Sequence, residues 1–269
     1  MTSGNPAMPA LKEQARRLLA AHELTNANLL WVLEQEPAVE VLLDDEERPG
    51  AVALLARAPT GEWQEPWFPD LRRLWLEARD RECARAVLRR LSAAEVLAVR
   101  IHRDWLTEVL AERYRLEPVQ ELVYFRGDGQ GFRPTVSFPV AVEEVLKPGV
   151  AELLEQTGRT AAGVRALVAR CGGVYVARLA GVPVGVCCVN VAKTAGISEI
   201  AAVYVLEAFR RRGVGQSLVS VAAQAIRARG RIPTYCTHHD NLASQALVRS
   251  LGFEQYQRVL SAVARPHVG

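Results

Sequence analysis

Lysine is nearly absent from this 269-residue sequence. Only Lys12, Lys147 and Lys193 are lysines among the 33 basic residues, so the remaining 30 are arginines. With 30 acidic residues the formal net charge is +3. So mild an excess of positive charge does not indicate binding to nucleic acid, which usually needs a strongly basic surface. We therefore expect no nucleic-acid partner.

Long hydrophobic runs are also missing. No apolar stretch approaches the ~18 residues that a membrane helix needs. Residues 1–10 contain no basic segment followed by an apolar one, so the sequence predicts a flexible tail there and no secretory signal. We expect a protein with no membrane partner.

The five cysteines are odd in number and follow no spacing typical of a metal site or a disulfide framework. This pattern favours the reducing cytoplasm and predicts no bound metal. Cys187 and Cys188 stand among valines in an expected strand. Free cysteine packs like a small hydrophobic residue, so we expect both to fill the core.

The composition that remains is that of an ordinary globular protein. Hydrophobic residues make up 49% and charged residues 23%, which excludes disorder, collagen and coiled coil as the main architecture. Three glycines within Gly127–Gly131, followed by Pro134, indicate a flexible connection. We therefore expect an N-terminal domain at 11–126, a linker at 127–134 and a second domain at 135–269.

The second half alternates between two hydrophobic periods. Short segments rich in β-branched residues alternate with segments whose apolar residues recur at helical spacing. This alternation predicts a mixed α/β sheet with helices on its faces. The expected strands are 135–142, 174–179, 182–191, 197–206, 233–237 and 256–263, and the expected helices are 147–157, 160–171, 213–229 and 241–251.

The first half ends in the same rhythm. A helix at 79–91, a strand at 95–101, a helix at 103–114 and a strand at 119–125 are expected. A shift of 137 residues lays this half on the second without a gap, with Arg73 on Arg210 and His102 on His239. The agreement in element order and length favours an internal duplication. Chance is the alternative, because few identities support the alignment.

The stretch 197–215 carries the clearest chemical signal. An apolar strand runs into the basic turn Arg210–Arg212, and a helix then starts at Gly213 and Gly215. Glycines let the backbone approach a ligand closely, and the first amides of a helix carry partial positive charge. The pattern predicts a site for phosphate or pyrophosphate. It lacks the lysine and hydroxyl of a nucleotide P-loop and the third glycine of a dinucleotide fingerprint. The alternative is an ordinary basic surface turn.

This stretch resembles the acetyl-CoA-binding motif of the GNAT N-acetyltransferase superfamily, Arg/Gln-x-x-Gly-x-Gly/Ala, here Arg210–Gly215. A second family motif, Asn followed eleven and twelve residues later by Gly-Phe, is present as Asn241, Gly252 and Phe253. The resemblance covers about 135–266. It implies the mixed-sheet GNAT acyltransferase fold, with two tandem GNAT-like halves of which the first is degenerate.

The degenerate half is expected not to bind CoA. In the 137-residue alignment Gly213 falls on Leu76 and Gly215 on Ala78, so the first half lacks the glycines of the phosphate loop.

The resemblance also implies roles for individual residues. Loop amides from Arg211 to Gln216 would hold the CoA pyrophosphate, and the backbone of Val203–Val205 would pair with the pantetheine arm. The Val205 amide would stabilise the oxyanion of the tetrahedral intermediate. The full set of CoA-contacting residues implied is Val203, Tyr204, Val205, Arg210, Arg211, Arg212, Gly213, Val214, Gly215, Gln216, Asn241 and Ser244.

Two further positions concern proton transfer. Glu199 lies six residues before Val205, where many family members place the general base. An amine with a pKa near ~10.4 must lose a proton before it attacks a thioester, and a carboxylate can take that proton. The alternative is an exposed strand glutamate without a chemical role. Many members carry a tyrosine acid where this sequence has Val248. The proton for the leaving thiolate would then come from water, from the attacking amine, or from one of Tyr235, His238 and His239.

The sequence thus predicts an acetyl-CoA-dependent N-acetyltransferase. It would move an acetyl group to a primary amine by direct attack in a ternary complex. One alternative is a longer-chain acyl-CoA N-acyltransferase similar to glycine N-acyltransferases, and another is a non-catalytic CoA-binding or scaffold protein. The acceptor is expected to be a small-molecule or peptide amine, and the protein a cytoplasmic monomer or homodimer. The sequence does not identify the acceptor, because that pocket has no shared signature.

Overall fold

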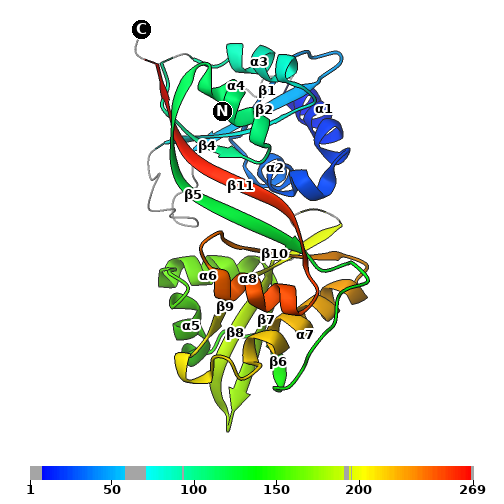
Figure 1. Ribbon diagram of the computed structural model, residues 1–269, viewed down its shortest axis with the longest axis vertical. Coiled ribbons are helices and arrows are strands. Elements are labelled where there is room, and N and C mark those ends of the chain that lie inside the picture. The colour runs from blue at the N-terminus through cyan, green and yellow to red at the C-terminus, as the bar shows by residue number, and fades with distance from the viewer. Residues whose placement is uncertain (1–7, 58–70, 93, 191–193, 195, 268–269) are drawn as a thin grey trace, which may run out of the picture. The chain divides into compact units, whose positions relative to one another are not determined.

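The computed structural model describes residues 8–57, 71–92, 94–190, 194 and 196–267. These residues form two compact units (Figure 1). Residues up to 122, together with 257–267, belong to unit 1, and residues 123–256 belong to unit 2. The strands β5 (Tyr114–Arg126) and β11 (Glu254–Pro266) contribute residues to both units.

Unit 1 contains a sheet with helices on both faces. Within this unit the strand order is β1-β2-β3-β4-β11-β5, with β1, β2 and β3 antiparallel and β3 parallel to β4. Its remaining elements are α1 (Met8–Ala20), α2 (Glu23–Gln35), β1 (Glu40–Leu43), β2 (Ala51–Arg57), β3 (Arg72–Ala78), α3 (Arg81–Arg89), β4 (Leu97–Ile101) and α4 (Asp104–Ala111).

Strand alternation explains the two cores of unit 1. Leu55 and Leu76 pack with α3 and α4, whereas their neighbours Leu54 and Trp75 pack with α1 and α2. Successive side chains of a strand point to opposite faces, so β2 and β3 are buried on both sides.

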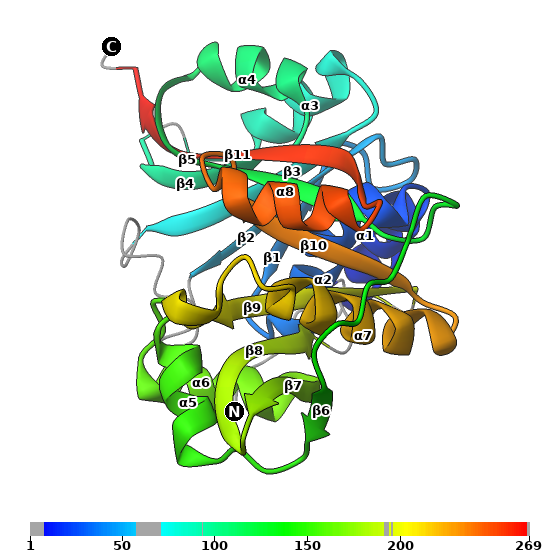
Figure 2. The same ribbon diagram turned by 60° about the horizontal axis from the view of Figure 1, so that its bottom comes forward.

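Unit 2 repeats this arrangement. Its strand order is β6-β7-β8-β9-β10 with the end of β5 next to β10; β7, β8 and β9 are antiparallel, and β9 is parallel to β10. Its elements are β6 (Val140–Glu143), α5 (Pro148–Glu155), α6 (Ala161–Arg170), β7 (Cys171–Leu179), β8 (Val182–Asn190), β9 (Ile197–Val205), the short 3₁₀ helix η1 (Glu207–Phe209), α7 (Val214–Ala228), β10 (Ile232–His238) and α8 (Leu242–Ser250). Figure 2 shows α7 beside β8 and β9.

The expected fold class is confirmed. Both halves contain two helices, three antiparallel strands, a helix, a parallel strand, a helix and a final strand, in that order. The constant shift of 137 residues is wrong, however. Arg73 lies within β3, whereas Arg210 lies in the loop after β9. The connections between matching elements differ in length, so only the element order repeats.

The expected tail and linker differ from the structure. Residues 1–7 lie outside the described residues, but Met8 to Ala10 begin α1. The glycine-rich segment is packed rather than loose. Gly127 N–H donates to the Pro233 carbonyl at 2.8 Å, and the Phe132 ring meets the Phe253 ring edge to face at 5.7 Å. Small residues are needed there for close approach, because a Cβ on Gly127 would lie 2.6 Å from the Phe253 ring.

The expected strand at 135–142 is mostly irregular. Only its last part, with Glu143, forms β6. The amides of Ser137 and Phe138 each donate to the Ser217 hydroxyl at 3.0 Å, and the Thr135 amide donates to Ser220 at 2.9 Å. These backbone amides therefore donate to serine hydroxyls of α7 and not to the carbonyl groups of a neighbouring strand. The units also differ from the expected domains at the C-terminus, because residues 257–266 of β11 insert between β4 and β5 of unit 1.

Candidate functional site

The parallel strands β9 and β10 of unit 2 separate part-way along their length. Their register runs from Ile197 opposite Ile232 to Ile200 opposite Tyr235. From there β9 continues to Val205 without further described pairing to β10. An edge of β9 is therefore available to a ligand at this point.

A bulge shapes the unpaired part of β9. Ala202 has a φ of +52°, and the β8–β9 register shifts between Val186 and Cys188. After the bulge Val203 and Val205 face the α7 side, and Ala202 faces the α5 and α6 side. Bulges re-aim backbone groups at functional sites. No residue pattern predicts this bulge, because a positive φ is unusual for alanine.

The backbone direction at the end of β9 follows from one hydrogen bond. Leu206 N–H donates to the Val184 carbonyl of β8 at 3.0 Å. Successive N–H groups of a strand point to opposite edges, so the Val205 and Val203 amides point away from β8. They lie on the edge that β10 has left. An extended ligand carrying amide groups can pair with such an edge as an added strand.

The loop after β9 leads into a helix start that the protein does not cap. Gly213 is the residue before α7, has a φ of +83° and makes no side-chain cap bond. A Cβ there would collide with the Ser137 hydroxyl. The first amides of α7 have no acceptor within the helix and carry its partial positive charge. This geometry suits an anion.

The three arginines of the loop are exposed, and two are tethered. Arg210 Nε donates to the Val205 carbonyl at 3.2 Å, and its guanidinium lies 5.8 Å from the centre of the Tyr204 ring. The Arg212 guanidinium lies 5.5 Å from the Phe209 ring. The loop thus holds positive charge beside the α7 start.

Two residues at the start of α7, Gly215 and Gln216, contact α8. A Cβ on Gly215 would lie 3.3 Å from Leu247, so glycine permits close packing of the two helices. The Gln216 side chain donates to the Ser250 hydroxyl at 3.0 Å.

The residues implied on α8 are partly engaged by the protein. Asn241 is exposed, and its side-chain oxygen caps the helix by accepting from the Ser244 amide at 3.1 Å. The Ser244 hydroxyl lies 2.7 Å from the Tyr235 hydroxyl. Burial raises the pKa of Tyr235 to about 12. Val248 is fully buried in the same core as Tyr235.

His238, the last residue of β10, and the following His239 are both exposed. The carbonyl oxygens of His238 and His239 accept from the Gln245 side chain, at 3.4 and 2.6 Å respectively. These bonds fix the backbone of the turn between β10 and α8.

Glu199 is buried, so the alternative of an exposed strand glutamate is wrong. It is 5% exposed and lies between Asn190 of β8 and Thr234 of β10 in the sheet register. Sequence reasoning missed two neighbours that interact electrostatically with its carboxylate. Burial lowers the pKa of Arg159, and the neighbouring Glu199 carboxylate opposes that change. Burial also raises the pKa of Tyr256, and the Glu199 carboxylate adds to this effect.

Sequence signals could not have found these neighbours. Arg159 lies between α5 and α6, and Tyr256 lies in the final strand. Neither belongs to a motif, and only the folded sheet brings them to Glu199.

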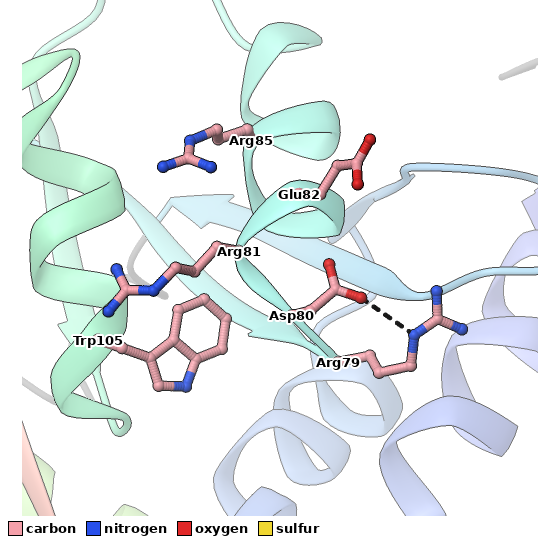
Figure 3. A pocket seen from close by; sticks show the side chains of 6 residues that line it. All are labelled: Arg79, Asp80, Arg81, Glu82, Arg85 and Trp105. Atoms are coloured by element: carbon pink, nitrogen blue, oxygen red, sulfur yellow. Dashed lines mark hydrogen bonds and ion pairs between the residues drawn. The ribbon is translucent and has the colours of Figure 1, made fainter.

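Unit 1 has a different structure at the matching position. Between β3 and α3 stand only Arg79 and Asp80, whereas residues 206–213 join β9 to α7. The Asp80 carboxylate accepts from the Cys83 amide at 2.9 Å, and this bond lowers the pKa of Asp80. A negative side chain therefore already occupies the α3 start. An open depression of about 550 Å³ lies around it, lined by Arg79, Asp80, Arg81, Glu82, Arg85 and Trp105. Figure 3 shows how these six side chains lie.

Comparison with known proteins identifies the domain. Residues 146–253 match the Acetyltransferase (GNAT) family. This stretch is a GNAT acetyltransferase domain. The protein is thus an acyltransferase, and the resemblance seen in its two motifs is confirmed for this part of the chain. No curated protein sequence matches the chain significantly.

Solved structures show the same fold at low sequence identity. A GCN5-related N-acetyltransferase from Sphaerobacter thermophilus is 16% identical, with a TM-score of 0.63 over 97% of this chain and 95% of that one. One from Kribbella flavida is 19% identical, with a TM-score of 0.60 over 92% and 95%. A tandem GNAT protein from the clavulanic acid biosynthesis pathway is 13% identical, with a TM-score of 0.58 over 96% and 95%.

No helix among the described residues has the length and apolar character needed to cross a membrane. No group of three or more His, Cys, Asp or Glu side chains among them is arranged to hold a metal ion.

Proposed function

We propose that unit 2 transfers an acetyl group from acetyl-CoA to a primary amine within a ternary complex. The observation that carries this proposal is the continuous stretch from Ala202 to Gly215. It begins with the strand edge that β10 leaves and ends at the uncapped start of α7. One ligand with an amide-bearing arm and a pyrophosphate matches both ends.

The binding roles follow from this stretch. The amides from Arg211 to Gln216 would hold the pyrophosphate, with Arg210 and Arg212 adding charge. The edge at Val203–Val205 would pair with the pantetheine arm. Asn241 would contact CoA from its exposed position at the α8 start. We assign Ser244 a weaker contact, because its hydroxyl already bonds Tyr235.

The chemistry is attack of a neutral amine on the thioester carbonyl. A carbon–nitrogen bond forms, and the carbonyl oxygen becomes negative in the tetrahedral intermediate. The Val205 N–H points to the strand edge and can donate to that oxygen. The nitrogen then loses a proton, the carbon–sulfur bond breaks, and the sulfur leaves as a thiolate that takes up a proton.

Glu199 supplies the base in this proposal. Its carboxylate would take the ammonium proton, directly or through water. Burial disfavours a charged carboxylate, whereas a nearby cation favours it. The half-buried Arg159 guanidinium supplies such a cation beside Glu199.

The test uses the full chain with acetyl-CoA and a panel of primary amines. We expect acetyl-CoA to bind by isothermal titration and free thiol to appear only when an accepted amine is present. Tighter binding and faster turnover with a longer acyl-CoA would show that this acyl-CoA, and not acetyl-CoA, is the preferred donor. Binding without turnover across the panel would contradict the enzymatic proposal and favour a CoA-binding protein.

A further inference from the structure

Two cysteines far apart in sequence lie on one face of the unit 2 sheet. Cys171 begins β7, and Cys188 lies in the neighbouring antiparallel strand β8. In the register Cys171 stands opposite Asn190, and Val174 stands opposite Cys188. Both cysteines contact the same cluster beneath α5 and α6. The sheet therefore brings together two thiols whose sequence spacing shows no relationship.

The two thiols are in direct contact, with a hydrogen bond between them. The strands are also irregular here. Between the pairs of the register, Gly172 and Gly173 of β7 face the single residue Val189 of β8. A bulge of this kind disrupts the ladder locally. It lies between the register positions of the two cysteines, where a sulfur–sulfur bond would have to form.

Cys187 is a natural comparison for Cys188. It is equally buried but packs in the cluster of α7 and α8, and its thiol donates to the Leu218 carbonyl at 3.8 Å. Adjacent strand residues point to opposite faces. Of this neighbouring pair, only Cys188 therefore faces Cys171.

The two contacting thiols differ in reactivity. Cys171 is half-buried, and the hydrogen bond from Cys188 lowers the pKa of its thiol. Cys188 is fully buried, and the hydrogen bond to Cys171 together with burial raises its pKa. The thiolate is the form that oxidants attack. Cys171 is therefore the thiol that reacts first, and Cys188 is the one placed to resolve the product.

We propose that Cys171 and Cys188 form a dithiol site that a peroxide oxidises to an intramolecular disulfide. The Cys171 thiolate attacks one peroxide oxygen, the oxygen–oxygen bond breaks, and a sulfenic acid and hydroxide result. The Cys188 sulfur then attacks the sulfenic sulfur, and a sulfur–sulfur bond forms as the sulfur–oxygen bond breaks. The Cys188 proton leaves with the departing oxygen. Two thiols and one hydrogen peroxide thus give one disulfide and two waters.

Tryptic peptide mapping of the full chain tests this site. Trypsin cleavage after Arg170, Arg178 and Lys193 separates Cys171 in peptide 171–178 from Cys188 in peptide 179–193. Hydrogen peroxide at equal concentration to the protein is the oxidant. We expect peptides 171–178 and 179–193 to appear linked without reductant, having lost two hydrogen atoms. Dithiothreitol should release them.

Because Cys187 and Cys188 share one peptide, matched variants decide which is used. C187A should keep the linked species, whereas C188A and C171S should lose it. C188V preserves the apolar contacts of the cluster if C188A unfolds, and thermal unfolding checks each variant. The proposal fails if oxidised wild-type protein shows no linked peptide. It also fails if the link persists in C188A or C188V.

Discussion

The hydroxyl of Tyr235 on β10 lies 2.7 Å from the hydroxyl of Ser244 on α8. Ser244 stands one helical turn before Val248, the position at which many GNAT proteins have a tyrosine acid. The two hydrogen-bonded hydroxyls therefore lie close to the position where this protein has Val248 instead of a tyrosine. Their location makes them the first candidates to examine as proton donor to the leaving thiolate.

We predict that Tyr235→Phe changes turnover by less than about tenfold, which is below the usual effect of losing an acid–base group. Burial raises the pKa of Tyr235 to about 12, so its proton is held more tightly than that of an ordinary tyrosine. Water or the attacking amine can instead protonate the thiolate. Stability should fall by ~1 kcal/mol from the lost hydrogen bond. Steady-state kinetics measure the change in turnover, with Ser244→Ala as the matched variant. A hundredfold loss of turnover in Tyr235→Phe would show that Tyr235 is the acid.

The exposed histidines provide the second test of the proton donor. The double variant His238→Ala with His239→Ala should keep the rate within about tenfold of the wild type. The structure shows backbone carbonyls of these residues in use, and alanine retains those carbonyls. Should the rate drop more than about a hundredfold while acetyl-CoA still binds, a histidine is the acid.

Glu199→Gln should slow acyl transfer by ~10²–10⁴-fold with little change in acetyl-CoA affinity. Glutamine keeps the size of the buried side chain but accepts no proton from the amine. Single-turnover kinetics and titration calorimetry separate the two quantities. The wild-type rate should rise with pH until either the base or the amine is deprotonated. Equal rates for variant and wild type at neutral pH would show that water or another group takes the proton.

Gly213→Ala should weaken acetyl-CoA binding at least tenfold. The residue has a φ of +83°, and a Cβ would meet the Ser137 hydroxyl, so the loop that presents the amides must shift. The left-handed conformation alone costs a non-glycine residue ~1–2 kcal/mol of stability. Gly230→Ala is the matched control, because Gly230 lies just after the end of α7, has a φ of +69° and has open space where a Cβ would lie. Equal loss of affinity in both variants would refute a local role for Gly213.

Val248→Tyr should destabilise the protein without raising turnover. Val248 is fully buried, so a larger side chain is forced into a packed core at a cost of about 1–3 kcal/mol. A chemical denaturation curve measures this cost, with Leu242→Tyr on the exposed face of the same helix as control. A more active and equally stable Val248→Tyr protein would show that the cleft reaches this position.

Apart from the strand expected at 135–142, the sequence predicted the main elements of unit 2, because its strands and helices have distinct hydrophobic periods. The loop at Arg210–Gly215 and the motif from Asn241 to Phe253 were visible because glycine and asparagine have specific backbone roles. The bulge at Ala202 was not visible, since register shifts depend on strand pairing rather than on residue type. Partners of Glu199 and the contact of Cys171 with Cys188 are likewise products of tertiary structure.

The glycine-rich segment misled the prediction for a physical reason. Glycine permits both flexibility and close packing, and local sequence does not distinguish them. In the structure Gly252, with a φ of +78°, lies directly against the Gly131 carbonyl. That contact depends on two segments more than a hundred residues apart.

Unit 1 provides a prediction about pH and stability. His102 Nε2 lies 2.5 Å from a Glu77 carboxylate oxygen, and Arg103 Nη2 lies 2.7 Å from the other oxygen. Both Glu77 and His102 side chains are about 5% exposed or less. Burial opposes ionisation of Glu77, but hydrogen bonds from His102 and Arg103 outweigh it and lower its pKa. The ionised form is therefore favoured by folding.

The sign of the pH dependence follows from that direction. A carboxyl whose pKa is lower in the folded state stabilises the protein above its unfolded pKa of about 4.3. The contribution is lost as the pH falls through the folded pKa of Glu77.

We predict that Glu77→Gln lowers the free energy of unfolding at pH 7 by about 1–3 kcal/mol, because the Arg103 guanidinium and the buried His102 ring lose their carboxylate partner. Below pH ~4 the gap between variant and wild type should shrink, since protonation removes the same charge from the wild type. Urea denaturation of both proteins across this pH range measures the gap, with the exposed Glu82→Gln on α3 as control. A gap that stays constant as the pH falls would show that the ion pair with His102 and Arg103 contributes nothing to folding.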